Sequence, residues 1–244
     1  MADMGVAALL KVTGQLDAPR MFERSAKLSP GQLHDDRGLV SMDKRALYPG
    51  PLTTLTDTCA ALGISQIEKL APHIKAARSV HFGSDGPIAK CYLEFAPDAA
   101  PAAGVVFLAL KMKADAARLN TYKLMPQAEA EQWVKLRLGE ISAVGGVAMQ
   151  TLSLAQKHDP DGQAVVLHVT EEGTDRESID ISVADAAVSL ADVSGLLAPV
   201  FAHFDVDAAD FMTTHGALQF GHLAIGSDQL GEGFATIYYG ARPI

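Results

Sequence analysis

Several features that mark common protein classes are missing from this sequence. It has only two cysteines, Cys59 and Cys91, far apart in a chain of 244 residues. A disulfide framework is therefore not expected, and we predict that both are small buried apolar residues in a reducing compartment. No apolar run approaches the ~20 residues that cross a bilayer, and the first residues lack the basic segment of a secretory signal. These absences predict a cytoplasmic protein with no membrane span.

Positive charge is also scarce, because the formal net charge is −9. Nucleic acids and anionic membranes attract proteins with basic surfaces, so neither is an expected partner. A local basic pocket inside an acidic protein stays possible. Hydrophobic residues make up 48% and charged residues 20% of the chain, a composition typical of a globular protein with a substantial core.

The familiar catalytic motifs are missing as well. The sequence has no glycine-rich phosphate loop before a helix, no CxxC, no HExxH and no GxSxG. Its eight histidines are not spaced as metal ligands. The acidic run "FDVDAADF" has a simpler explanation, because Asp207 is suited to cap a helix. We therefore expect neither a metal nor a cofactor.

The order of predicted elements indicates α+β organisation. Helical spacing of Leu52, Leu55, Cys59 and Leu62 is followed by a second helix and by a strand pair around "GSDG". Helices at 188–204 and 205–215 precede a second hairpin at 217–240. Further strands are predicted at 104–113, 121–125, 133–141, 164–172 and 178–184. The first fifty residues give weaker signals: a strand at 6–12, a short helix at 18–28 and a loop at 29–39. Short connections between strands favour antiparallel pairing.

The two helix–helix–strand–strand segments also resemble each other in sequence. "FGSDG" corresponds to "IGSDQ", and "KCYLEFA" corresponds to "FATIYYG". We interpret this as an internal duplication. The predicted fold is α+β, with duplicated ααββ units forming an antiparallel sheet or closed barrel covered by helices. Residues 1–47 are expected to be an N-terminal extension packing on the core. Residues 48–244 are expected to be one domain of two related halves, about 48–125 and 140–244.

Charged and apolar residues alternate along several predicted strands. In "AKCYLEF", Lys90, Tyr92 and Glu94 share one face, while the other carries apolar side chains. The same pattern places Lys111 with Lys113, and Lys135 with Arg137. The apolar faces are expected to pack on helices. The polar faces then meet either water or the lumen of a barrel, where Lys and Arg would bind a polyanion.

Repeated ααββ units with K-x-Y on a strand resemble the ABBA-type aromatic prenyltransferases, also called PT-barrel enzymes. The resemblance implies a closed barrel whose lumen binds an allylic diphosphate beside an aromatic acceptor. By resemblance, the diphosphate cradle and the tyrosine shield would be Lys90, Tyr92, Lys111, Lys113, Lys135, Arg137 and Tyr238. The chain departs from the family pattern in being short for five units, and Thr236 of the second copy stands where the first has Lys90.

Three side chains are candidates for proton transfer. Glu94 shares the face of Lys90, His168 is predicted to approach Asp180 across a hairpin, and His222 lies on a late strand. Each has an ordinary structural explanation too. Three functions stay open: a small-molecule transferase, with prenyl transfer from an allylic diphosphate as the candidate reaction; a non-catalytic small-ligand or protein-binding module on the same fold; and an enzyme using His168 or His222 as general acid–base.

Overall fold

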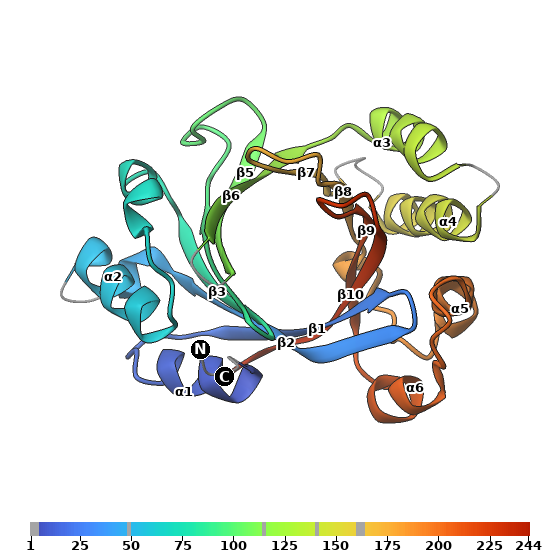
Figure 1. The fold of residues 1–244 in the computed structure, drawn as a ribbon, viewed down its shortest axis with the longest axis horizontal. Helices are drawn as coiled ribbons and strands as arrows, with labels where there is room; N and C mark the ends of the chain where they lie inside the picture. Colours follow the sequence, from blue (N-terminus) through green and yellow to red (C-terminus); the bar gives the residue numbers. More distant parts are fainter. Residues whose placement is uncertain (1–4, 48–49, 114–115, 140–141, 160–163) are drawn as a thin grey trace.

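The computed structural model describes residues 5–47, 50–113, 116–139, 142–159 and 164–244. Within these residues, ten antiparallel strands form a closed barrel (Figure 1). They are β1 (Met21–Ser29), β2 (Gln32–Asp43), β3 (Ser79–Asp85), β4 (Ile88–Glu94), β5 (Val105–Lys113), β6 (Ala116–Leu124), β7 (Val166–Glu171), β8 (Glu177–Ser182), β9 (Phe220–Ser227) and β10 (Gly233–Pro243). Each strand pairs with its neighbours in sequence, and β10 pairs with β1 to complete the ring.

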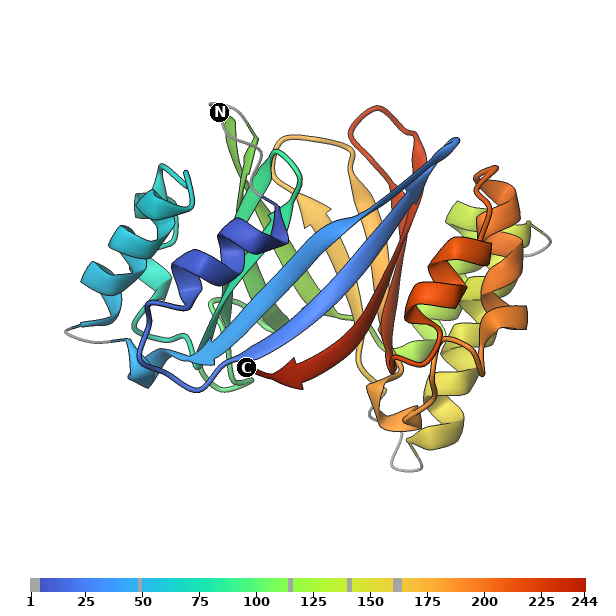
Figure 2. The same ribbon diagram turned by 90° about the horizontal axis from the view of Figure 1, so that it is seen from below.

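The strands form five hairpins, and the described turns of β1–β2, β3–β4, β7–β8 and β9–β10 lie at one end of the barrel (Figure 2). In the β3–β4 hairpin, Asp85 pairs with Ile88 and the turn passes through Gly86. Gly86 has φ +56°, a left-handed conformation that glycine adopts without steric cost. The opposite end of the barrel holds the longer connections that run out to the helices (Figure 2). We refer to these ends as the turn end and the helix end.

Helices cover two flanks of the barrel. One flank carries α1 (Val6–Thr13) and α2 (Pro51–Ala61). The other flank carries α3 (Gln127–Val134), α4 (Ala143–His158), α5 (Ser194–His203) and α6 (Ala209–His215) (Figure 1). The connection from β4 to β5, residues 95–104, contains no described helix. The ring of helices is therefore interrupted next to β5. No helix in the described part of the chain is long and apolar enough to cross a membrane.

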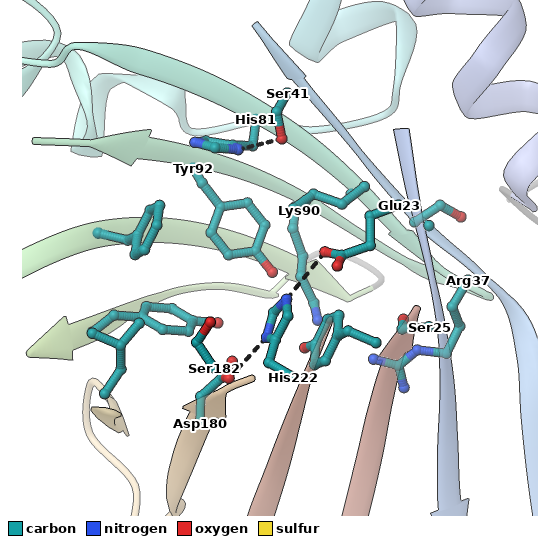
Figure 3. A pocket seen from close by; sticks show the side chains of 18 of the residues that line it. Glu23, Ser25, Arg37, Ser41, His81, Lys90, Tyr92, Asp180, Ser182 and His222 are labelled. Atoms are coloured by element: carbon teal, nitrogen blue, oxygen red, sulfur yellow. Dashed lines mark hydrogen bonds and ion pairs between the residues drawn. The ribbon is translucent and has the colours of Figure 1, made fainter. Parts of the chain in front are cut away.

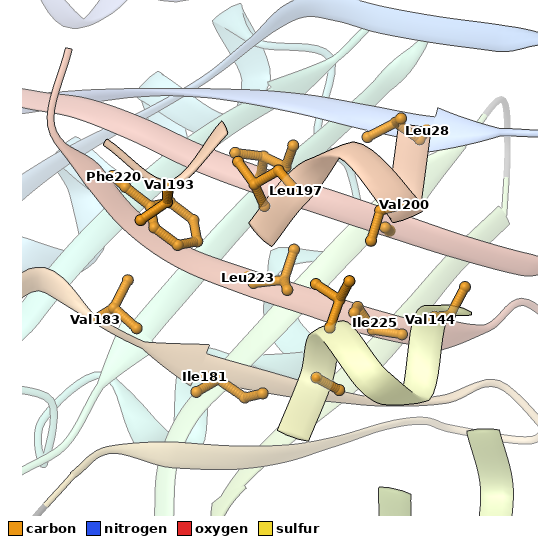
Figure 4. Close-up of a cluster of buried hydrophobic side chains, with 14 of the residues drawn as sticks. Leu28, Val144, Ile181, Val183, Val193, Leu197, Val200, Phe220, Leu223 and Ile225 are labelled. Carbon is orange, nitrogen blue, oxygen red and sulfur yellow. The ribbon is translucent and has the colours of Figure 1, made fainter. Parts of the chain in front are cut away.

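The hydrophobic core lies between the helices and the outer faces of the strands. On one flank, Leu197 and Val200 of α5 pack with Leu223 and Ile225 of β9 (Figure 4). A second cluster joins α1 and α2 to β2–β5 and includes Cys59 and Cys91, which are buried and free. On most strands the apolar residues pack against helices and the polar residues that alternate with them face the interior of the barrel. β7 is an exception, because its apolar Leu167 and Val169 line the lumen.

The predicted fold class is confirmed, and the sheet is a closed barrel rather than an open sheet. Both segments expected as ααββ units carry the predicted hairpins, β3–β4 and β9–β10, after helical residues. A further hairpin, β7–β8, follows α3 and α4. The division into two halves at about 48–125 and 140–244 stays a prediction.

The N-terminal region differs from expectation. We predicted that residues 1–47 would pack on the core as an extension, but β1 and β2 form part of the barrel wall itself. Residues 18–28, predicted to form a short helix, instead contribute to β1. Charged residues occur on both faces of this strand, so the alternation of polar and apolar residues that marks a strand is hidden. Arg24 lies on the outer face near the Phe22 ring, 5.7 Å from its centroid. Residues 6–12, which we predicted to form a strand, form most of helix α1 instead.

The strand predicted at 133–141 is also wrong. Good helix formers at 127–132 begin α3, where Ala130 and Val134 are buried one turn apart. The helical path continues through one π-helical segment, η4 (Lys135–Gly139). Residues 140–141 lie outside the described residues. The period-two pattern of "VKLRL" was therefore overridden by the helix that precedes it.

Candidate active site in the barrel lumen

Two adjacent cavities occupy the lumen. The first has a volume of about 290 Å³ and is lined mainly by aromatic and neutral side chains toward the helix end. The second, about 130 Å³, lies toward the turn end and is lined by many cations. Five residues line both cavities: Arg37, Lys90, Tyr122, Asp180 and Tyr238. We call them the aromatic compartment and the cationic compartment, and these five residues mark their junction.

Cations outnumber carboxylates around the cationic compartment. The three carboxylates are Asp85, Asp180 and Asp228; the six cations are Lys27, Arg37, Lys90, Lys111, Lys113 and Arg176. The cations come from five segments of the chain: β1, β2, β4, β5 and the connection from β7 to β8. This local excess of positive charge contrasts with the chain as a whole, which has a formal net charge of −9.

Some of these cations have buried N–H donors without a hydrogen-bond acceptor among the described residues. Arg37 is only 5% exposed, yet its Nε is buried without a hydrogen-bond partner among the described residues, as is Nη1 of Arg176. Lys111 is better paired, with Nζ 2.8 Å from Oε2 of Glu171. Buried donors that lack acceptors are costly. An anion with several oxygens would satisfy them, because guanidinium groups bind such oxygens with two donors at once.

Burial and neighbouring charges also shift the pKa values of the side chains that line the cationic compartment. Burial is the main cause that lowers the pKa of Lys90 to about 7; Asp85 opposes this, and Arg37, Lys111 and Arg176 lower it further. Burial would raise the pKa of Asp85, but Arg37, Lys90 and Lys27 outweigh it and bring that pKa to about 2. The pKa of Lys27 is also lowered, chiefly by burial. Burial, and to a smaller extent the neighbouring cations, thus both disfavour the charged form of the lysines in this compartment.

Aromatic rings line the other compartment. The centroids of Tyr92 and Tyr122 are 5.8 Å apart, and Phe107 lies 5.9 Å from Tyr122 and 5.5 Å from His81. Burial raises the pKa of Tyr92, Tyr122 and Tyr238, so these phenols stay neutral. A flat apolar molecule would therefore meet ring faces and neutral hydroxyl groups in this compartment.

One ionised triad interrupts this apolar wall. His222 lies between two carboxylates, with Nδ1 2.8 Å from Asp180 and Nε2 3.1 Å from Glu23 (Figure 3). Its ring stacks on Tyr238 at 4.0 Å with an interplanar angle of 1°. Burial disfavours the charged ring, but Asp180 and Glu23 outweigh it and raise the pKa of His222 well above its usual value. The two flanking carboxylates therefore favour the protonated form of the His222 ring, in which both nitrogens can donate.

The structure brings six of the sequence-predicted site residues into the lumen. They are Lys90, Tyr92, Lys111, Lys113, His222 and Tyr238. Glu94 faces inward but lies at the helix end, outside the lining of both cavities. It is 3.1 Å from His81 and 3.0 Å from Arg78. The hydrogen bond from His81 is the main cause that lowers the pKa of Glu94, despite partial burial.

Three predicted site residues lie outside the barrel. His168 is on the outer face of β7, opposite Ile179 rather than Asp180, and its Nε2 is 2.7 Å from Glu177. Lys135 and Arg137 lie on η4, which is not a strand, and Arg137 pairs with Glu177 at 3.2 Å. The predicted approach of His168 to Asp180 is therefore wrong, because adjacent residues of a strand face opposite sides.

Other lumen residues were missed. Glu23 and Lys27 face inward from β1, Arg37 from β2, and Arg176 from the β7–β8 connection. In β1, Glu23, Ser25 and Lys27 do alternate with Phe22, Ala26 and Leu28. That pattern was detectable, but it was obscured by Arg24. Arg37 gave no such signal, because it follows a polar run at the hairpin.

No family model matches the sequence, and no curated protein matches it. Solved structures do match the fold. The chain is similar to 5-dimethylallyl tryptophan synthase from Streptomyces coelicolor in complex with DMASPP and Trp, with a TM-score of 0.61 and 13% identity over 89% of this chain and 78% of that one. It is also similar to prenyltransferase PriB with product diphosphate, with a TM-score of 0.60 and 15% identity over 90% and 79% of the two chains. A third match is 6-dimethylallyltryptophan synthase from Micromonospora olivasterospora, with a TM-score of 0.52 and 12% identity over 90% and 81%. The chain therefore has the PT-barrel fold of the ABBA-type aromatic prenyltransferases, as the resemblance implied.

Proposed function

We propose that this protein is a small-molecule transferase that moves a prenyl group from an allylic diphosphate to an aromatic acceptor in the barrel lumen. One observation carries the proposal: a buried compartment with excess cations adjoins an aromatic compartment inside one closed barrel. Three solved structures of the same fold contain a prenyl diphosphate analogue or diphosphate, which supports it.

The cationic compartment is suited to the leaving group. When the allylic carbon–oxygen bond breaks, negative charge develops on the diphosphate oxygens. Arg37, Lys90 and Lys111 stabilise that charge from fixed positions in a site shielded from water. Because side-chain cations neutralise the diphosphate here, we expect the reaction to need no metal ion.

The junction is suited to the allylic cation. Tyr122 and Tyr238 place aromatic rings at the junction, and Tyr92 lies beside Tyr122 on the aromatic side, where ring faces attract a cation and exclude water. The aromatic acceptor would lie on the other side of these rings. Its carbon would then bond to the prenyl carbon as the diphosphate departs.

The triad of Glu23, His222 and Asp180 provides the proton acceptor. His222 already carries its proton, so it is not the base; it donates to the carboxylates and holds them in place. Glu23 or Asp180 accepts a hydrogen bond from the acceptor's N–H or O–H group. The same carboxylates take the proton that leaves the ring carbon after attack.

Calorimetry with dimethylallyl and geranyl diphosphate tests the donor site. Lys90→Ala is expected to lose binding, whereas Lys135→Ala, the same change on η4 outside the barrel, is expected to keep it. Mass spectrometry of mixtures with indoles and phenols then tests transfer. If folded protein gives no heat with either diphosphate, the donor assignment is wrong. Tight binding without any prenylated product would instead favour the non-catalytic binding module.

A further inference from the structure

An acidic side chain, Asp85, lines the compartment that we assign to an anion. Asp85 ends β3, directly opposite Arg37 of β2 in the strand register. Its side chain is only 16% exposed and it lines the cationic compartment. A carboxylate at this position repels any diphosphate that binds there, so its presence needs an explanation.

The contacts of Asp85 explain why a carboxylate is present in this compartment. Its Oδ1 is 3.0 Å from Nη1 of Arg37, and its Oδ2 is 3.6 Å from Nζ of Lys90. These two cations come from β2 and β4, the strands on either side of β3. The carboxylate therefore connects two cations across three adjacent strands, at the junction of the compartments. The other cations that act on it are Lys27 from β1 and Lys111 from β5.

In an empty barrel these cations would repel one another. Without a counter-ion, Arg37 would turn away, and Lys90 would lose its proton more readily. Asp85 offsets this repulsion and holds both side chains toward the lumen. A site that is already arranged needs less reorganisation when the ligand arrives.

We propose that Asp85 is a positioning residue that substitutes for the diphosphate in the empty site. It holds Arg37 and Lys90 ready for the ligand, and its own charge then limits how tightly the diphosphate is retained. This inference rests on the proposed function. It adds a reason why a barrel with so many cations would release its diphosphate product after each reaction.

Binding of inorganic diphosphate at pH 6 tests the inference by calorimetry. Asp85→Asn removes the repelling charge and keeps the shape, so it is expected to bind diphosphate about tenfold more tightly, or more, because like charges in close contact strongly oppose association. Asp85→Glu restores the charge and is expected to stay within about threefold of the native protein. Asp98→Asn removes the same charge from the exposed 95–104 connection and serves as the matched control.

An Asp85→Asn variant that binds diphosphate equally or more weakly overturns the inference, because the charge of Asp85 would then not limit how tightly diphosphate is held. If that variant is unfolded alone, folding upon addition of diphosphate supports the inference, and failure to fold at saturating diphosphate contradicts it. The two proposals fail separately. Native protein that does not bind diphosphate refutes the proposed function, whereas native binding without tightening in the Asn variant refutes only the role of Asp85.

Discussion

Raising the pH from 6 to 8 is expected to weaken diphosphate binding about tenfold through Lys90 alone. In the empty barrel the pKa of Lys90 is about 7, mainly because its ammonium group is buried. A bound diphosphate supplies the negative charge that this group lacks and raises its pKa. Binding therefore takes up a proton whenever Lys90 starts neutral.

The size and sign of the effect follow from that pKa. At pH 6 Lys90 is already protonated, so binding carries no proton cost. Above pH 7 each further pH unit weakens binding about tenfold until the pKa of the bound form is reached. The dissociation constant at pH 8 should thus exceed that at pH 6 by about tenfold, with affinity lost as the pH rises.

Diphosphate itself titrates in this range, so a reference protein is needed. Lys90→Arg keeps a positive charge at every pH used, and the ratio of the two dissociation constants removes the ligand's own titration. Calorimetry of both proteins at pH 6, 7 and 8 gives that ratio. A ratio that stays within about twofold across the series would refute the reasoning, because Lys90 would then not change its protonation on binding.

Three other expectations follow from the placement of side chains. Glu23→Gln should lower the rate of prenyl transfer by about 10²-fold while diphosphate affinity in calorimetry stays within about twofold, because Glu23 lines only the aromatic compartment; an unchanged rate would exclude Glu23 from the chemistry. Arg37→Ala should weaken diphosphate binding by tenfold or more, about 1.4 kcal/mol, whereas Arg137→Ala, on η4 outside the barrel, should not change it; equal losses would contradict the lumen assignment. Leu197→Ala should lower the free energy of unfolding by about 2–5 kcal/mol in urea denaturation, because Leu197 is fully buried between α5 and the barrel; a loss below about 1 kcal/mol would mean that this flank repacks.

Much of the fold followed from short-range patterns. The β3–β4 and β9–β10 hairpins carry turn residues between alternating strands, and both were predicted near their observed bounds. The predictions were wrong in regions where neighbouring residues favour different secondary structures. In β1 a charged residue, Arg24, occupies the outer face, and in 127–139 strong helix formers precede an alternating segment.

The candidate site was predictable only in part, for a related reason. Lys90, Tyr92 and Lys111 lie on strands whose opposite faces are apolar, so the alternation alone marked them. Lys135 and Arg137 show the same spacing but lie on a helical segment. Spacing by two residues identifies a lumen side chain only after the segment is known to be a strand.

By itself the sequence determined which side chains share a strand face, because that depends only on the period of the backbone. It therefore indicated that Lys90 and Tyr92 lie opposite Cys91 and Leu93. Only the tertiary structure decided that this polar face points into an enclosed lumen rather than into water. That outcome depends on β10 pairing with β1, more than two hundred residues apart in the chain. Closure of the ring brings Glu23 to His222, and the pairing of β2 with β3 brings Arg37 to Asp85; no local pattern encodes either contact.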